Sequence, residues 1–228
     1  MTPAPASSPA LRACLFDLDG TLINTEPQYS RLWKAIGERY LPLQPTFHTD
    51  IKGTTLAQIL NRYFPDEALQ KRISDELDAF EGSDMVFEFF PGAVAFVQEL
   101  RAHGVLTAIV TSSNRRKMDV VRRKLPACNA LFDAVLTSED FRASKPDPDC
   151  FLTAARRLQV PTSACAVFED APNGLEAGIR SGMLTIGMVG SLSLEKIQGL
   201  CHAARQGWGE TSYEWVAQQL QKHNELTQ

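Results

Sequence analysis

The sequence predicts an α/β protein with a doubly wound parallel sheet and an inserted small α-helical cap domain. Two observations carry this prediction. Apolar runs of three to five residues alternate with helical patterns along most of the chain, which is typical of parallel strands buried on both faces. A stretch of about 65 residues near the N-terminus interrupts the alternation and contains helical patterns only.

Five apolar runs are the predicted strands, and the patterns between them are the predicted helices. The strands cover residues 13–16, 106–110, 134–136, 166–168 and 184–188. The helices cover 93–102, about 117–124, 149–158, and a segment that opens near Pro172 and closes at Gly182. Proline at the start and glycine at the stop are the preferred ends of a helix. This alternation predicts a Rossmann-like core, followed after residue 191 by mostly amphipathic or polar helix.

The interrupting segment carries three apolar stripes at helical spacing, which begin at Tyr29, Leu56 and Leu69. Pro27 and the pair Pro91-Gly92 punctuate its two junctions. We therefore expect residues 25–90 to form the cap domain. Residues 11–24 and 91–228 are expected to form the core, and residues 1–10 a disordered tail. Extra helices packed rigidly on the core are the alternative.

Composition limits the classes of partner. The 228 residues are 44% hydrophobic and 22% charged, with 23 basic against 27 acidic residues and a formal net charge of −4. This balance gives no electrostatic case for nucleic acid or an anionic membrane as the main partner, and no apolar run has the roughly 20 residues that span a bilayer. Five cysteines without a C-x-x-C pair, and no secretory signal, predict a reducing cytoplasm. A monomer is the default expectation.

Two carboxylates follow the first predicted strand, in the segment Asp17-Leu18-Asp19-Gly20-Thr21. Like charges 4 Å apart repel by about 4 kcal/mol at the effective dielectric of a protein surface. A bound cation, a proton or a substrate of matching charge offsets such a repulsion. This segment therefore points to chemistry, although Asp17 alone would also suit a turn or a helix cap.

Polar clusters follow three further strands. They are the segments TSSN at 111–114, SKPDPD at 144–149 and EDAPNG at 169–174. Because the carboxyl ends of parallel strands meet at one edge of the sheet, we expect carboxylates, hydroxyls and a lysine to gather there. That combination suggests a hydrated metal ion and a phosphate that share one site.

In this order, the segments DLDGT, TSSN, KPDPD and FEDAPNG resemble the four motifs of the haloacid dehalogenase-like hydrolase superfamily. The resemblance extends from about residue 11 to about residue 190 and is strongest to the phosphatase branch with a helical cap after the first motif. It implies that Asp17 is the nucleophile that forms an aspartyl-phosphate. It also implies that Asp19 is the general acid and then the base, and that Lys145 neutralises Asp17 and the phosphoryl charge.

The same resemblance implies Mg²⁺ as cofactor. Its ligands would be the Asp17 carboxylate, the Asp19 backbone carbonyl and Asp170, with Glu169 as a second-rank ligand or an outer partner. The segment of Ser112, Ser113 and Asn114 is expected to bind the phosphoryl oxygens. Each residue also has a simpler role available: the serines as helix caps, Lys145 as a turn lysine, and Asp170 as an N-cap.

Within the family, the chain is most similar to β-phosphoglucomutase and its phosphatase relatives. The mutases carry a cap histidine about twelve residues after the nucleophile, where this chain has Tyr29. They also carry a cap arginine shortly after a Lys-Gly pair, whereas Lys52-Gly53 here precedes Thr54, Thr55 and Leu56. The missing arginine removes a bidentate clamp for a second phosphate. Arg115 and Arg116 leave a mutase open as an alternative.

These residues predict a Mg²⁺-dependent phosphatase acting on a small phosphorylated metabolite, a sugar-type or nucleoside-type phosphomonoester. Glu26 and Gly53 are the expected substrate contacts on the cap side. A mutase and a non-catalytic protein that binds a phosphometabolite are the alternatives. A dehalogenase would need neither Asp19 as acid and base nor a metal carboxylate such as Asp170.

Overall fold

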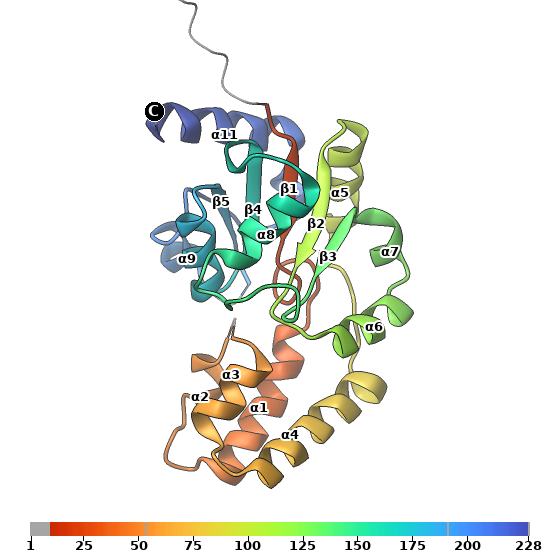
Figure 1. The fold of residues 1–228 in the computed structure, drawn as a ribbon, viewed down its shortest axis with the longest axis vertical. Helices are drawn as coiled ribbons and strands as arrows, with labels where there is room; N and C mark the ends of the chain where they lie inside the picture. Colours follow the sequence, from red (N-terminus) through yellow and green to blue (C-terminus); the bar gives the residue numbers. More distant parts are fainter. Residues whose placement is uncertain (1–9, 53, 191, 228) are drawn as a thin grey trace, which may run out of the picture.

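Six parallel strands form one sheet in the order β3-β2-β1-β4-β5-β6 (Figure 1). The computed structural model describes residues 10–52, 54–190 and 192–227. The strands are β1 (Ala13–Phe16), β2 (Leu106–Val110), β3 (Ala134–Leu136), β4 (Cys165–Glu169), β5 (Leu184–Met188) and β6 (Ala203–Arg205). The predicted fold class, an α/β core with a helical cap inserted after β1, is confirmed.

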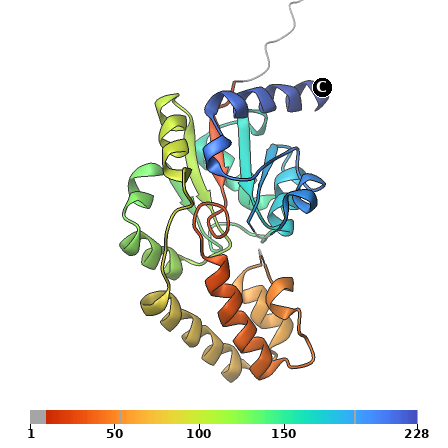
Figure 2. The ribbon, with the colours of Figure 1, turned by 180° about the vertical axis from the view of Figure 1, so that it is seen from behind.

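The two faces of the sheet are covered by different helices. Alternate residues of a strand point to opposite faces, so Cys14 and Phe16 join one apolar cluster while Ala13 and Leu15 join the other. The first cluster lies beneath α5 (Ala93–Ala102) and α11 (Tyr213–Thr227), which are seen in front of the sheet in Figure 2. The second lies beneath α8 (Asp149–Leu158) and α9 (Pro172–Arg180). The sheet is thus buried on both sides, as its continuous apolar strands predicted.

The remaining core elements are short. They are α6 (Arg115–Lys124), α7 (Ala127–Leu131), η2 (Thr162–Ala164), α10 (Leu194–Gln198) and η3 (Trp208–Glu210). Helix α6 begins two residues before the predicted start because Asn114 caps it, its side-chain oxygen accepting the backbone N–H of Lys117 at 2.9 Å. The prediction for the segment after residue 191 was incomplete, since β6 lies within it. This strand has only three half-buried residues and no apolar run, so hydropathy alone does not reveal it.

The regular elements in the described part of the inserted segment are all helices. It contains α1 (Glu26–Tyr40), α2 (Phe47–Asp50), α3 (Leu56–Tyr63), α4 (Glu67–Ala79) and the π-helix η1 (Phe80–Asp84). Nine buried side chains form an apolar cluster of its own, with Ile36, Phe47 and Ile73 among the least exposed. The cap therefore has a hydrophobic core separate from the two clusters of the sheet.

Two chain connections join the cap to the core, and they run side by side. Ile23 bridges to Phe89, the backbone N–H of Asn24 donates to Glu88 at 3.0 Å, and that of Phe90 donates to Leu22 at 2.9 Å. This pairing supports domain boundaries near residues 24 and 91, which remain predictions. No helix among the described residues combines the length and apolarity needed to cross a membrane.

Candidate active site

The polar clusters predicted at the strand ends meet at one edge of the sheet, facing the cap. Phe16 of β1 pairs with Phe168 of β4, and the backbone N–H of Asp17 donates to the Phe168 carbonyl at 3.0 Å. This register brings Asp17 next to Glu169 and Asp170. Parallel strand order therefore assembles carboxylates that lie about 150 residues apart in the sequence.

Lys145 is the centre of this group. Its side chain is only 1% exposed, and its ammonium lies 2.6 Å from Asp17 Oδ1, 2.7 Å from Glu169 Oε1 and 3.2 Å from the Val110 carbonyl. Burial by itself lowers the pKa of Lys145, but the charges of Asp17 and Glu169 outweigh burial and raise that pKa. The lysine is thus a permanent cation beside the predicted nucleophile.

Glu169 is held by the protein through both carboxylate oxygens. Oε1 accepts from Lys145, and Oε2 accepts the backbone N–H groups of Asp170 and Ala171 at 2.8 Å each. Those two N–H groups lie at the entry to α9, where the helix dipole favours a negative charge. The contacts support an outer role for Glu169, one of the two roles predicted for it.

Asp17, Glu169 and Asp170 form a buried group whose ligand oxygens lie within 4.8 Å of one another. Burial raises the pKa of Asp17 well above its usual range; Lys145 opposes that rise, while Glu169 and Asp170 add to it. Two of these three carboxylates share the Lys145 ammonium, which leaves excess negative charge in the group, and hard oxygen donors are what Mg²⁺ prefers. The donor set therefore fits the divalent cation that the family implies.

The backbone conformation of Gly20 and its close approach to Asp170 explain why the first motif has a glycine at this position. Its backbone has a φ of +85°, a conformation that side-chain-bearing residues rarely adopt, and a β-carbon there would collide with the Asp170 carboxylate. The Asp170 carboxylate also accepts the hydroxyl of Thr21 at 3.0 Å. The backbone of the first motif thus lies in contact with Asp170, the residue that follows β4.

Asp19 is bound by three side chains. Its Oδ1 accepts the hydroxyl of Thr25 at 2.5 Å, while its Oδ2 accepts the hydroxyl of Ser113 at 3.0 Å and the ammonium of Lys117 at 2.5 Å. Thr25 lies at the junction with the cap, and the other two follow β2. The predicted acid and base is therefore held where the cap and the core meet.

A cavity of about 560 Å³ extends from these carboxylates into the cap. Ser112, Ser113 and Asn114 line its core side, although the side chain of Asn114 also caps α6. On the cap side, Glu26 forms an ion pair with Lys52 at 2.8 Å, and both residues line the cavity. The predicted contact Gly53 lies outside the described residues. The volume is within the range of small-molecule sites.

Two residues of this site were missed by the sequence-based reasoning. Lys117 was interpreted only as the approximate start of a helix, and Tyr29 only as the start of an apolar stripe and as the residue that replaces a mutase histidine. The structure places the Lys117 ammonium 4.4 Å from the centre of the Tyr29 ring, inside the cavity wall. A lysine in the first turn of a helix was the available signal, because the helix dipole disfavours a cation there.

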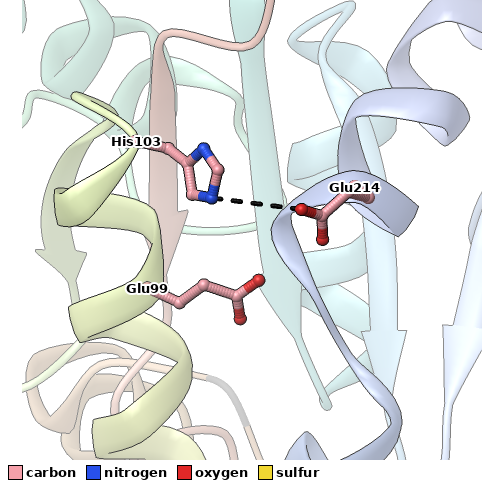
Figure 3. Close-up of side chains that lie close together, drawn as sticks. All are labelled: Glu99, His103 and Glu214. Carbon is pink, nitrogen blue, oxygen red and sulfur yellow. Dashed lines mark ion pairs between the residues drawn. The ribbon is translucent and has the colours of Figure 1, made fainter.

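A second group of ligand-type side chains lies between α5 and α11 (Figure 3). Glu99 accepts the backbone N–H of Tyr213 at 2.9 Å, the ring of His103 stacks on that of Tyr213 at 3.9 Å, and His103 lies 4.0 Å from Glu214. His103 and Glu214 are exposed. These contacts attach α11 to α5, so the group has a structural role.

A parallel α/β core with an inserted helical cap holds the buried carboxylates beside Lys145, and comparisons with known proteins show the family to which this arrangement belongs. The chain matches the haloacid dehalogenase-like hydrolase family over residues 11–182. A solved HAD hydrolase of family IA, variant 3, from Entamoeba histolytica superposes with a TM-score of 0.79 at 24% identity, covering 92% of this chain and 99% of that one. The chain therefore belongs to the haloacid dehalogenase-like hydrolase family.

Curated relatives show to which members of this family the chain is similar. The chain is 30% identical over 210 residues to beta-phosphoglucomutase of Mycobacterium tuberculosis, covering 77% of this chain and 79% of that protein. It is 30% identical over 224 residues to (DL)-glycerol-3-phosphatase 1, mitochondrial, of Arabidopsis thaliana, covering 90% and 72%. It also matches Protein SUPPRESSOR OF QUENCHING 1, chloroplastic, of the same plant at 31% identity, covering 79% of this chain but only 18% of that longer protein. The chain is a phosphatase of the family.

Proposed function

We propose that this protein hydrolyses small phosphomonoesters of the sugar or nucleoside type through an aspartyl-phosphate on Asp17. One observation carries the proposal: Lys145 pairs with Asp17 and Glu169 in a buried carboxylate group that also contains Asp170, and this group borders a cavity large enough for a small metabolite. Phosphatases of small phosphorylated metabolites among the relatives support the same substrate class.

In the first half-reaction, a carboxylate oxygen of Asp17 attacks the phosphorus and the bond to the leaving-group oxygen breaks. Asp19 donates its proton to that oxygen, so a neutral alcohol departs. Lys145 stays charged beside Asp17 and stabilises the phosphoryl oxygens. Ser112 and neighbouring backbone N–H groups after β2 are the proposed holders of those oxygens.

In the second half-reaction, Asp19 takes a proton from a water molecule as that water attacks the phosphorus. The acyl-phosphate bond breaks, inorganic phosphate leaves, and Asp17 and the protonated Asp19 are restored. The two-step route divides one difficult hydrolysis into two displacements. It requires Asp19 near both the leaving group and the water, which its place on the cavity wall supports.

Asp17, Asp170 and the backbone carbonyl of Asp19 are the proposed ligands of Mg²⁺, with Glu169 as an outer partner. When bound, the ion supplies positive charge that offsets the repulsion between carboxylates and phosphate. The two hydrogen bonds that Glu169 accepts from the entry of α9 support this division of roles.

The charges on the cavity wall favour hydrolysis over a mutase reaction. Among the described lining residues, the cap supplies Glu26, Asp78 and Glu81; Glu26 pairs with Lys52 and Asp78 with Arg116 of α6, so a second phosphate would compete with carboxylates for these cations. A second phosphate on the substrate would meet these carboxylates, and Leu56 lines the cavity in the segment where a mutase carries its arginine. The relatives named beta-phosphoglucomutase keep the mutase as the second candidate.

The central experiment measures Mg²⁺-dependent release of phosphate from p-nitrophenyl phosphate and from a panel of sugar and nucleoside phosphates. Asp17→Asn is expected to abolish release, whereas the same change at the exposed Asp75 leaves it intact. Full activity of Asp17→Asn, or of the wild type in excess chelator, contradicts the proposal.

The mutase is tested with β-glucose 1-phosphate. Formation of glucose 6-phosphate without net release of phosphate would favour the mutase instead.

For the compartment, we propose a reducing cytoplasm, which the five free cysteines support.

A further inference from the structure

Lys117 is a buried cation in contact with the proposed acid and base. Only 5% of the residue is exposed, and its ammonium lies 2.5 Å from Asp19 Oδ2. Ser113 shares the same oxygen at 3.0 Å. A buried lysine is stable only with a close counter-ion, so the positions of Lys117 and Asp19 depend on each other.

The sequence of α6 places this lysine against the preference of the helix. Its first turn reads Arg115-Arg116-Lys117 and contains no acidic residue, although the positive end of the helix dipole favours acidic residues there. Arg115 pairs with Asp140 and Arg116 pairs with Asp78, and the side chains of both arginines are exposed. Only Lys117 of the three turns inward. A buried cation placed against the helix dipole in this way is expected at a functional position.

The cap contacts the lysine from the other side. The Lys117 ammonium lies 4.4 Å from the centre of the Tyr29 ring, a distance at which the ring face attracts a cation. The Tyr29 hydroxyl donates to the buried Glu81 at 2.6 Å. Burial, Asp19 and Glu81 raise the pKa of Tyr29 well above its usual range, so this hydroxyl keeps its proton. Helices α1 and η1 of the cap thus fix the lysine together.

We propose that Lys117 is a positioning residue that holds the Asp19 carboxylate in place for proton transfer, and that Tyr29 and Glu81 of the cap set the position of Lys117. The inference rests on the proposed function of Asp19. Asp19 is the residue of the motif that faces the cap junction, and the carboxylates around Asp17 repel it. Without the lysine, Ser113 and Thr25 would be its remaining contacts.

The experiment compares two esters of the same shape in one enzyme sample. Phenyl phosphate releases a basic phenolate that needs a proton, whereas p-nitrophenyl phosphate releases an anion that leaves without one. Lys117→Met is expected to lower kcat/KM, which reports only the first half-reaction, roughly tenfold or more further for phenyl phosphate than for p-nitrophenyl phosphate. KM stays near the wild-type value. The ratio of the two rates does not depend on the fraction of enzyme that is folded.

Arg122→Met is the matched control. Arg122 is also on α6 and forms an exposed ion pair with Asp119 of the same helix at 3.9 Å, away from the cap and from Asp19. It should leave the ratio unchanged. In an Asp19→Asn background, Lys117→Met should cause no further change in the ratio, and Lys117→Arg should restore part of it.

Four results would overturn the inference: equal loss on both esters, a rise in KM alone, a higher kcat, or an effect that persists in the Asp19→Asn background. A rise in KM alone would make Lys117 a substrate contact. If the wild type hydrolyses no phosphate ester, the proposed function fails first, and that result is distinct from all four.

Discussion

The carboxylate of Glu169 occupies the space that a β-carbon would fill at Gly174. Glu169 lies at the end of β4 and Gly174 in the first half of α9, so the absence of a side chain lets the carboxylate pack against the helix. From there Glu169 reaches Lys145 at 2.7 Å. The glycine of the fourth motif therefore supports the position of Lys145.

Gly174→Ala is expected to destabilise the protein. Helix propensity alone predicts a gain of about 1 kcal/mol, but the collision with Glu169 should turn this into a loss of about 1–3 kcal/mol. Displacement of Glu169 should also lower kcat roughly tenfold or more. Urea unfolding and phosphate release measure the two effects. Gly199→Ala is the control, because a β-carbon there has only the Lys196 carbonyl nearby, at 3.9 Å; equal losses for both variants would contradict the explanation.

Lys145→Met should cost about 3–5 kcal/mol of unfolding free energy, because it leaves Asp17 and Glu169 buried without their cation. The exposed pair of Lys71 and Asp75 is a control of similar length, 2.7 Å. Lys71→Met should change stability by less than about 1 kcal/mol. Denaturant titration in metal-free buffer compares them. Similar values for the two variants would show that burial of the Lys145 pair has no energetic weight.

Mg²⁺ alone should raise the melting temperature of the wild type, because a ligand that binds only the folded state stabilises it, by about 2.7 kcal/mol at a hundred times its Kd. Asp170→Asn should remove this shift. Glu99→Gln changes the second acidic group and should keep it. Thermal unfolding with and without the ion is the measurement. Loss of the shift in Glu99→Gln, with retention in Asp170→Asn, would move the site to the other group.

Stability should fall as the pH drops from about 7.5 to about 5.5, in part through His202. Partial burial and the neighbouring His223 lower the pKa of His202, and its Nδ1 accepts the backbone N–H of Thr185 at 2.9 Å. The unfolded chain therefore binds a proton at a higher pH than the folded protein, so acidification favours unfolding.

His202→Asn keeps an acceptor near the position of Nδ1 and removes the titration. It should therefore flatten the loss of melting temperature over this pH interval. His48→Asn, at a partly exposed position of the cap helix α2, controls for the loss of one histidine. An unchanged pH slope in His202→Asn would remove this residue from the explanation.

Much of the core was predictable because its signals are local. The bounds of β1, β2, β3 and β5 agree with the apolar runs, and α5 and α8 agree with the helical patterns. Strand β4 extends to Glu169, which pairs in register with Gly187 although it is charged. Its burial depends on Lys145, a contact between residues 24 positions apart that hydropathy does not contain. Strand β6 was missed for a similar reason, since pairing with β5 and not composition makes it a strand.

The sequence by itself determined the alternation of β1 to β5 with helices, the inserted cap and the four polar motifs, because apolar periodicity and short motifs depend on neighbouring residues. Tertiary structure decided which charges are buried and paired. Of the three cations that open α6, only the folded chain distinguishes Lys117, enclosed between Asp19 and Tyr29, from its exposed neighbours. The reason is physical: the effect of a charge depends on burial and on partners a few ångströms away, and folding brings those partners from distant parts of the chain.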